Sequence, residues 1–91
     1  GPPLMQSYFV YLIVTKKNNK TISYVGYTTN IIKRLIDHNS SKGAKATRGK
    51  QWEYAYLKRY NFKSDAMKGE FKLKKNYKLR NKIKSNFFRN E

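Results

Sequence analysis

Tyr24-Val25-Gly26 is the most informative segment of this chain, because two basic side chains follow it on one predicted helix. Arg34 comes eight residues after Gly26, and His38 comes four residues after Arg34. The apolar run Phe9-Val10-Tyr11 precedes the segment and is separated from it by a polar turn. Two tyrosines, an arginine and the only histidine of the chain thus fall within 28 residues. These residue types suit the binding of a phosphate and the movement of a proton beside it.

The residues around this segment predict a β-hairpin. Residues 7–15 are β-branched and aromatic, with apolar side chains at alternating and intervening positions, which is typical of a central strand. Residues 16–20 (Lys-Lys-Asn-Asn-Lys) are a turn signal, and residues 21–27 predict the second strand. A hairpin folded about Lys17-Asn18 would place Tyr11 opposite Tyr24 and on the same face of the sheet.

A helix is expected directly after the hairpin. Asn30 is its expected N-cap, and residues 31–39 form the helix. The spacing predicts that Ile32, Leu35 and Ile36 face the core. Arg34 and His38 are four residues apart, so they share a different face of the same helix.

The second half of the chain predicts a loop, a strand and a broken helix. Residues 40–51 are polar, and residues 52–60 form an aromatic-rich strand that contributes to the sheet core. Ser64 or Asp65 is expected to cap a helix from residue 66, which bends or breaks near Asn76 and then resumes. The predicted fold is therefore α+β, a small three-stranded sheet flanked by helices in the order strand, strand, helix, strand, helix, helix.

Glu70 is singled out by its position in the second predicted helix. Ala66, Glu70 and Leu73 recur at helical spacing, so the carboxylate lies on or beside an apolar stripe. A carboxylate there costs several kcal/mol unless it is paired or binds a metal ion. The sequence is compatible with either an ion pair between Glu70 and a nearby lysine or a metal site at Glu70.

The amino-acid composition limits the classes of function that the chain can have. With 91 residues, it is expected to form one domain, residues 5–91, after a tag scar at residues 1–4. Lys and Arg number 21 against 5 Asp and Glu, which gives a net charge of +16 and predicts a polyanionic partner, with nucleic acid first. The chain has no cysteine, which excludes disulfides, a thiol nucleophile and sulfur-based zinc sites, and its single histidine argues against other zinc sites.

The expected compartment and partners follow from the same composition. No apolar run approaches the roughly 18 residues that span a bilayer, and no secretory signal is seen, so we expect an intracellular, cytoplasmic protein without a membrane partner. No small-molecule cofactor is expected, and the oligomeric state stays open.

The ordered set of motifs resembles the GIY-YIG nucleases. Phe9-Val10-Tyr11 stands at the first family motif, with Phe and Val in place of Gly and Ile, and Tyr24-Val25-Gly26 stands at the second. Arg34, His38 and Glu70 match the family positions that follow. The resemblance covers roughly residues 7–75, and the segment 38–48 is similar to small standalone bacterial members and to the nuclease subunit that cuts branched DNA.

The resemblance implies metal-dependent hydrolysis of a phosphodiester bond in DNA. Arg34 would grip the phosphate oxygens, and His38 would donate to the same phosphate or to the leaving group. Glu70 would hold the cofactor, Mg²⁺ or Mn²⁺. Tyr11 or Tyr24 would serve as the general base, and the sequence leaves open which one does so.

Phosphate contacts outside the catalytic set are expected from basic side chains. The residues predicted to contact DNA are Lys42, Lys45, Arg48, Lys50 and Lys74. The sequence leaves open whether the preferred DNA is single-stranded, duplex or branched. The alternative function is a basic nucleic-acid-binding module that keeps the fold and cleaves nothing, and a third is a structural RNA-associated protein.

Overall fold

The fold follows the predicted order of elements. The computed structural model describes residues 6–89, so the expected tag scar at residues 1–4 lies outside the described residues. The elements are β1 (Tyr8–Lys17), β2 (Lys20–Thr28), α1 (Ile31–Asn39), the short 3₁₀ turn η1 (Lys45–Thr47), β3 (Glu53–Tyr60), α2 (Lys63–Lys75) and α3 (Tyr77–Arg89). The predicted α+β class is confirmed, and within residues 6–89 no helix is long and apolar enough to cross a membrane.

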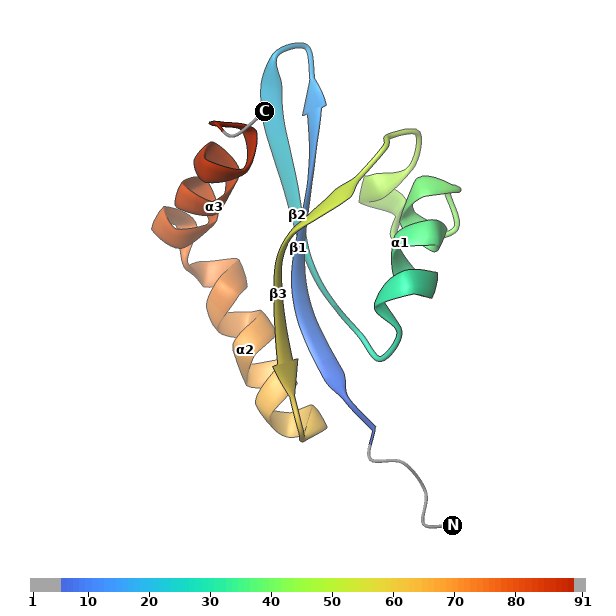
Figure 1. The fold of residues 1–91 in the computed structure, drawn as a ribbon, viewed down its shortest axis with the longest axis vertical. Helices are drawn as coiled ribbons and strands as arrows, with labels where there is room; N and C mark the ends of the chain where they lie inside the picture. Colours follow the sequence, from blue (N-terminus) through green and yellow to red (C-terminus); the bar gives the residue numbers. More distant parts are fainter. Residues whose placement is uncertain (1–5, 90–91) are drawn as a thin grey trace.

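The central strand of the sheet is β1, as its two apolar faces predict. The strand order is β2-β1-β3, and both pairings are antiparallel. Figure 1 shows α1 on one side of the sheet and α2 with α3 on the other. Both faces of β1 are therefore covered, which is why its interior residues are fully buried on either face.

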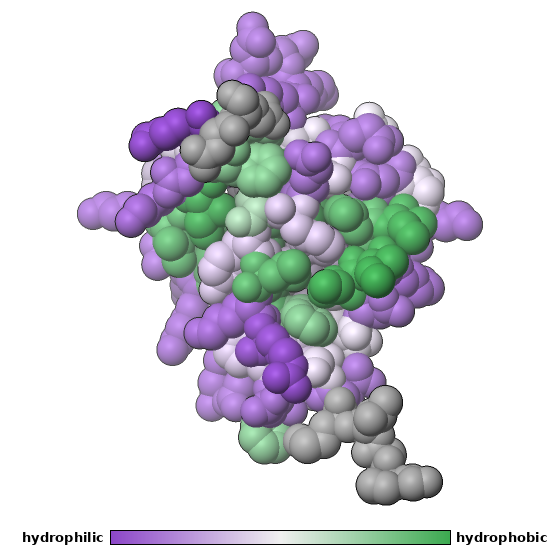
Figure 2. All heavy atoms as spheres, viewed as in Figure 1, coloured by the Kyte–Doolittle hydropathy of each residue, from purple (hydrophilic) through white to green (hydrophobic). Residues whose placement is uncertain are grey.

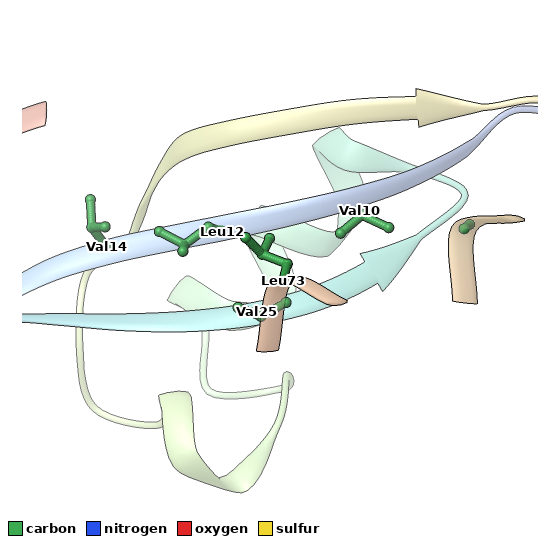
Figure 3. Packing of buried hydrophobic residues seen from close by; sticks show 6 residues of the cluster. Val10, Leu12, Val14, Val25 and Leu73 are labelled. Atoms are coloured by element: carbon green, nitrogen blue, oxygen red, sulfur yellow. The ribbon is translucent and has the colours of Figure 1, made fainter. Parts of the chain in front are cut away.

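Alternating residues of β1 enter two separate clusters. Val10, Leu12 and Val14 pack with Val25 of β2 and Leu73 of α2, and Figure 3 shows this cluster from close by. Side chains on the opposite face of β1 pack toward α1. They are Tyr11 and Ile13, with Trp52, Leu35, Tyr24 and Tyr54 around them.

The expected hairpin register is wrong by two residues. Asn18 and Asn19 both adopt positive φ, 53° and 67°, so they form the two central residues of the turn. Asparagine tolerates this conformation, which twists in the sense that a hairpin needs. Tyr11 therefore lies opposite Gly26, and Tyr24 lies opposite Ile13. The two tyrosines remain on the same face as diagonal neighbours.

Helix α1 begins as predicted but turns a different face to the sheet. The Asn30 side chain accepts a hydrogen bond from the Lys33 backbone amide at 3.0 Å, which confirms the N-cap. The predicted core stripe is only partly correct, because Ile32 and Ile36 are 73% and 60% exposed. The helix meets the sheet through Leu35 and the buried His38 instead.

The exposed isoleucines leave an apolar surface over α1. Together with Ile31, Leu35 and Tyr54 they line a hollow of about 480 Å³. Figure 2 shows hydrophobic side chains gathered on this side of the molecule.

Helix α2 starts earlier than predicted. It begins at Lys63, and its N-cap Phe62 makes no side-chain capping bond, so Ser64 and Asp65 lie inside the helix and do not cap it. Burial of Ala66 and Leu73 against the sheet fixes the position of this helix. The predicted break at Asn76 is confirmed, and its side-chain oxygen accepts from the Leu79 backbone amide at 3.1 Å to start α3.

Candidate active site

Tyr11 of β1 meets two side chains of α1 at a single oxygen atom. Its hydroxyl lies 2.7 Å from His38 Nε2. Arg34 Nε donates a hydrogen bond to the same hydroxyl at 3.2 Å. Tyr11 and His38 are completely buried, whereas Arg34 is half-buried. The i, i+4 spacing of Arg34 and His38 thus places both groups over one face of the sheet.

Gly26 makes room for the Tyr11 ring. The two residues are paired across β1 and β2, and a Cβ atom at position 26 would overlap the Tyr11 phenol. The ring therefore lies across the backbone of the edge strand, where a side chain would otherwise stand. The glycine of the Tyr24-Val25-Gly26 segment is required by this close approach, which the sequence could not show.

Thr47 determines which nitrogen of His38 carries the proton. Its hydroxyl donates to the Ala44 carbonyl at 2.8 Å and lies 2.9 Å from His38 Nδ1. A hydroxyl has one proton, and the geometry suits its donation to the Ala44 carbonyl. Thr47 must therefore accept from Nδ1–H, which leaves Nε2 of a neutral His38 as an acceptor for the Tyr11 hydroxyl. We infer the direction of each hydrogen bond in the chain from this arrangement.

Burial sets the protonation states of the two buried groups. Desolvation raises the pKa of Tyr11, and the nearby Arg34 charge offsets only part of this increase. Desolvation lowers the pKa of His38 below its usual value of 6.5, and the Arg34 charge lowers it further. At neutral pH the phenol is therefore protonated and the imidazole is neutral.

Tyr24 occupies a different position from Tyr11. Its ring packs edge-on to His38 with the ring centroids 5.5 Å apart. Within residues 6–89 its hydroxyl has no hydrogen-bond partner, and the side chain is half-buried. The two tyrosines therefore differ in kind, since only the Tyr11 hydroxyl is joined to Arg34 and His38.

Glu70 is not in direct contact with the other four predicted site residues. It comes from α2, which packs on the face of the sheet opposite α1 (Figure 1). Its carboxylate lies 3.7 Å from Lys74 Nζ, and its side chain is 22% exposed. Its charge nevertheless reaches Tyr11, because it adds a small increase to the pKa that burial already raises.

The residues predicted to contact DNA fall into two groups. Lys42, Lys45, Arg48 and Lys50 belong to the segment between α1 and β3, on the same side as His38 and Thr47. Lys74 lies on α2 beside Glu70. Only the first group is contiguous with the hydrogen-bonded network.

Sequence reasoning missed two residues that support this network. Thr47 lies in an irregular segment nine residues after His38, where no periodicity indicates its partner. The Tyr54 ring packs 5.4 Å from that of Tyr11, and its hydroxyl donates to the Ile31 carbonyl at 2.7 Å. Burial raises the pKa of Tyr54 to about 12, so it is a neutral wall of the site.

The single histidine allows the predicted hydrogen-bond directions to be tested by NMR. Nitrogen-15 spectra of the imidazole are expected to show a neutral ring with its proton on Nδ1 and a pKa below 6.5. Because the unfolded chain takes up this proton first, the free energy of unfolding should fall as the pH drops below about 6.5.

Thr47→Val is the matched variant for this measurement, because valine has the same shape and no acceptor. It should leave Nδ1–H unpaired, mix the two tautomers and cost about 1–3 kcal/mol of stability. Thr47→Ser should restore the wild-type spectrum. An unchanged tautomer in Thr47→Val would show that Thr47 does not set it.

Comparison with known proteins places the whole network within one family domain. Residues 7–84 match the family model described as the GIY-YIG catalytic domain. A UPF0213 protein of Staphylococcus haemolyticus is 37% identical over 71 residues, which cover 77% of this chain and 83% of that protein. No solved structure matches the chain.

Other similar proteins carry the same UPF0213 name. One from Staphylococcus epidermidis is 37% identical over 81 residues, covering 88% of this chain and 94% of that protein. Another from Natronomonas pharaonis is 38% identical over 65 residues, covering 70% of this chain and 75% of that protein. The segment that matches the family model includes every residue of the hydrogen-bonded network and Glu70.

Proposed function

Since the chain belongs to the GIY-YIG family of nucleases, we propose that it is a divalent-metal-dependent endonuclease that hydrolyses phosphodiester bonds in DNA. The observation that carries this proposal is the Tyr11 hydroxyl, held between the Arg34 guanidinium and the acceptor nitrogen of His38. A net charge of +16 supplies the attraction to a polyanionic substrate.

Tyr11 acts as the general base by passing on its own proton. Its raised pKa keeps it protonated at neutral pH, so it accepts a proton from water only while it gives its own to His38 Nε2. The water becomes the nucleophile, and His38 ends as the imidazolium. Thr47 holds the acceptor nitrogen toward Tyr11 throughout. The Tyr24 hydroxyl has no neighbouring acceptor for its proton within residues 6–89, so its role is to form one side of the site and to position water.

Arg34 couples substrate binding to this proton transfer. Its Nε–H is bonded to the Tyr11 hydroxyl, and within residues 6–89 its terminal nitrogens have no hydrogen-bond partner. These nitrogens can grip two oxygens of one phosphate and stabilise the charge that develops there. Tyr11 is buried beneath Arg34, so movement of the guanidinium onto a phosphate gives water access to the phenol oxygen.

Glu70 is the residue that would hold the metal ion. It is a half-buried carboxylate whose distance to Lys74, 3.7 Å, is long for a charged hydrogen bond. In the described part of the chain no group of three His, Asp or Glu side chains could hold a metal, which fits an ion that keeps most of its waters, such as Mg²⁺ or Mn²⁺. When bound, such an ion supplies positive charge to the phosphate oxygens.

A plasmid-nicking assay tests the proposal directly. Purified protein is incubated with supercoiled DNA in Mg²⁺, in Mn²⁺ and in excess EDTA, with labelled RNA and single-stranded DNA in parallel. Nicked circles should accumulate with either metal ion and not in EDTA. DNA that stays intact under all conditions while it binds the protein would favour the alternative, a binding module that has kept the fold.

A further inference from the structure

A second group of cations lines a cavity near the hairpin end of β1. The cavity has a volume of about 360 Å³ and lies between residues 15–17 of β1 and residues 48–51, which precede β3. Four of its seven lining residues are basic and none is acidic: Lys16, Lys17, Arg48 and Lys50. Of these, only Arg48 and Lys50 were predicted from the sequence to contact DNA.

The charges of this cavity are not neutralised by the protein. The ion pairs of residues 6–89 join Lys33 to Asp37 and Lys74 to Glu70, and none involves a lining residue. Glu53 lines the adjoining hollow together with Lys16, but it forms no ion pair with it. Lys17, Arg48 and Lys50 therefore have no counter-charge within residues 6–89, so an external anion is the partner that fits.

Two of the lining lysines contact other parts of the fold. Lys50 Nζ donates to the Ala46 carbonyl at 3.4 Å. Lys16 Nζ instead lies 4.5 Å from the centroid of the Phe88 ring of α3, on the face of β1 opposite Tyr11, so Lys16 is not counted among the phosphate contacts. Side chains that are already positioned lose less conformational freedom when they bind a ligand.

The cavity lies in line with the proposed active site. Arg48 directly follows Thr47, whose hydroxyl contacts His38. Thr15 and Lys17 lie on the same face of β1 as Tyr11, four and six residues further along the strand. At about 3.3 Å per residue, these positions are roughly 13–20 Å from Tyr11, which is about four to six nucleotides along one strand of B-DNA.

We infer that this cavity is a second phosphate-binding site, which docks the backbone of duplex DNA about four to six nucleotides from the phosphate that Arg34 grips. The inference rests on the proposed function for the identity of its ligand. A duplex fits best because it is stiff over this distance, so two separate cationic sites can engage it together. Its role is to fix the position of the substrate rather than to read its sequence.

The salt dependence of DNA binding tests the inference without cleavage. A fluorescein-labelled 20-base-pair duplex is titrated in EDTA at 50 and 200 mM salt with wild type and with the variant K17Q/R48Q/K50Q. Loss of three phosphate contacts should reduce the slope of log K against log salt by about 2.7, so the fourfold rise in salt should weaken the variant about 40-fold less than wild type.

A charge-matched variant separates this site from the overall charge. K72Q/K78Q/K82Q removes the same number of exposed cations from α2 and α3 and should keep the wild-type slope. The inference is overturned if K17Q/R48Q/K50Q keeps that slope or if both variants lose it equally. Failure of the nicking assay alone would contradict the proposed nuclease and leave this binding result standing.

Discussion

Tyr11→Phe is expected to lower the single-turnover rate of DNA cleavage by about 10²–10⁴-fold, the usual contribution of a general acid–base group. Phenylalanine keeps the ring that lies over Gly26, so the fold and the α1 packing should survive. What is lost is the hydroxyl that joins Arg34 to His38 and carries the proton between water and the imidazole. Affinity for DNA, measured separately in EDTA, should change little because the many cations remain.

Two other tyrosines serve as controls for this substitution. Tyr54→Phe removes a hydroxyl that bonds the Ile31 carbonyl and touches neither Arg34 nor His38, so stability should fall while the cleavage rate stays near wild type. Tyr24→Phe should cost less than Tyr11→Phe, because the Tyr24 hydroxyl lacks an acceptor within residues 6–89. The opposite order of effects would assign the general base to Tyr24.

Glu70→Ala is expected to reduce metal-supported cleavage by about 10³-fold or more, since a bound metal ion contributes several kcal/mol of transition-state stabilisation. DNA affinity in EDTA should be retained or should rise, because a negative charge is removed near the phosphate. The carboxylate also adds to the pKa of Tyr11. Loss of the Glu70 carboxylate therefore also lowers the pKa of Tyr11, even though no hydrogen bond joins the two residues.

Glu53→Ala is the matched control for net charge. Glu53 is an exposed carboxylate at the start of β3 and makes no ion pair within the described chain. The same gain of one positive charge there should leave the single-turnover cleavage rate at saturating DNA unchanged, although Glu53 lines the hollow beside the second phosphate site. If Glu70→Ala protein cleaves as fast as Glu53→Ala protein, Glu70 does not hold the metal ion, and the metal assignment fails.

Local sequence signals predicted much of the fold. The β-branched and aromatic residues 7–15, apolar on both faces, identified a central strand, because only a strand covered on both faces buries consecutive side chains. Asn30 was identified as a helix cap by its residue type and position, and Asn76 as a break between helices. Each of these features depends on near neighbours in the chain.

Features that depend on distant contacts were predicted less well. The hairpin register is set by the backbone conformation of Asn18 and Asn19, and a shift of one turn position moved every pair by two residues. The helical spacing of α1 favoured Ile32 as a core residue, but burial of His38 against Tyr11 turned that side outward.

For the candidate site too, the features set by local sequence were predicted and those set by distant contacts were not. Residue types and order brought Tyr11, Arg34 and His38 together correctly as a group, since a strand and the helix after the hairpin place them on one face. The partner that fixes the His38 tautomer, Thr47, lies in an irregular segment whose path no local pattern gives. Glu70 approaches from the other face of the sheet, which spacing along a helix cannot show.

The pH dependence of single-turnover cleavage, compared with the NMR titration of His38, tests the central claim most directly. Proton transfer from Tyr11 requires a neutral imidazole, so the rate should fall at acid pH with the same pKa, below 6.5, that the His38 signal shows. A rate that stays constant while the His38 signal titrates would contradict the proposed proton path from water through Tyr11 to His38.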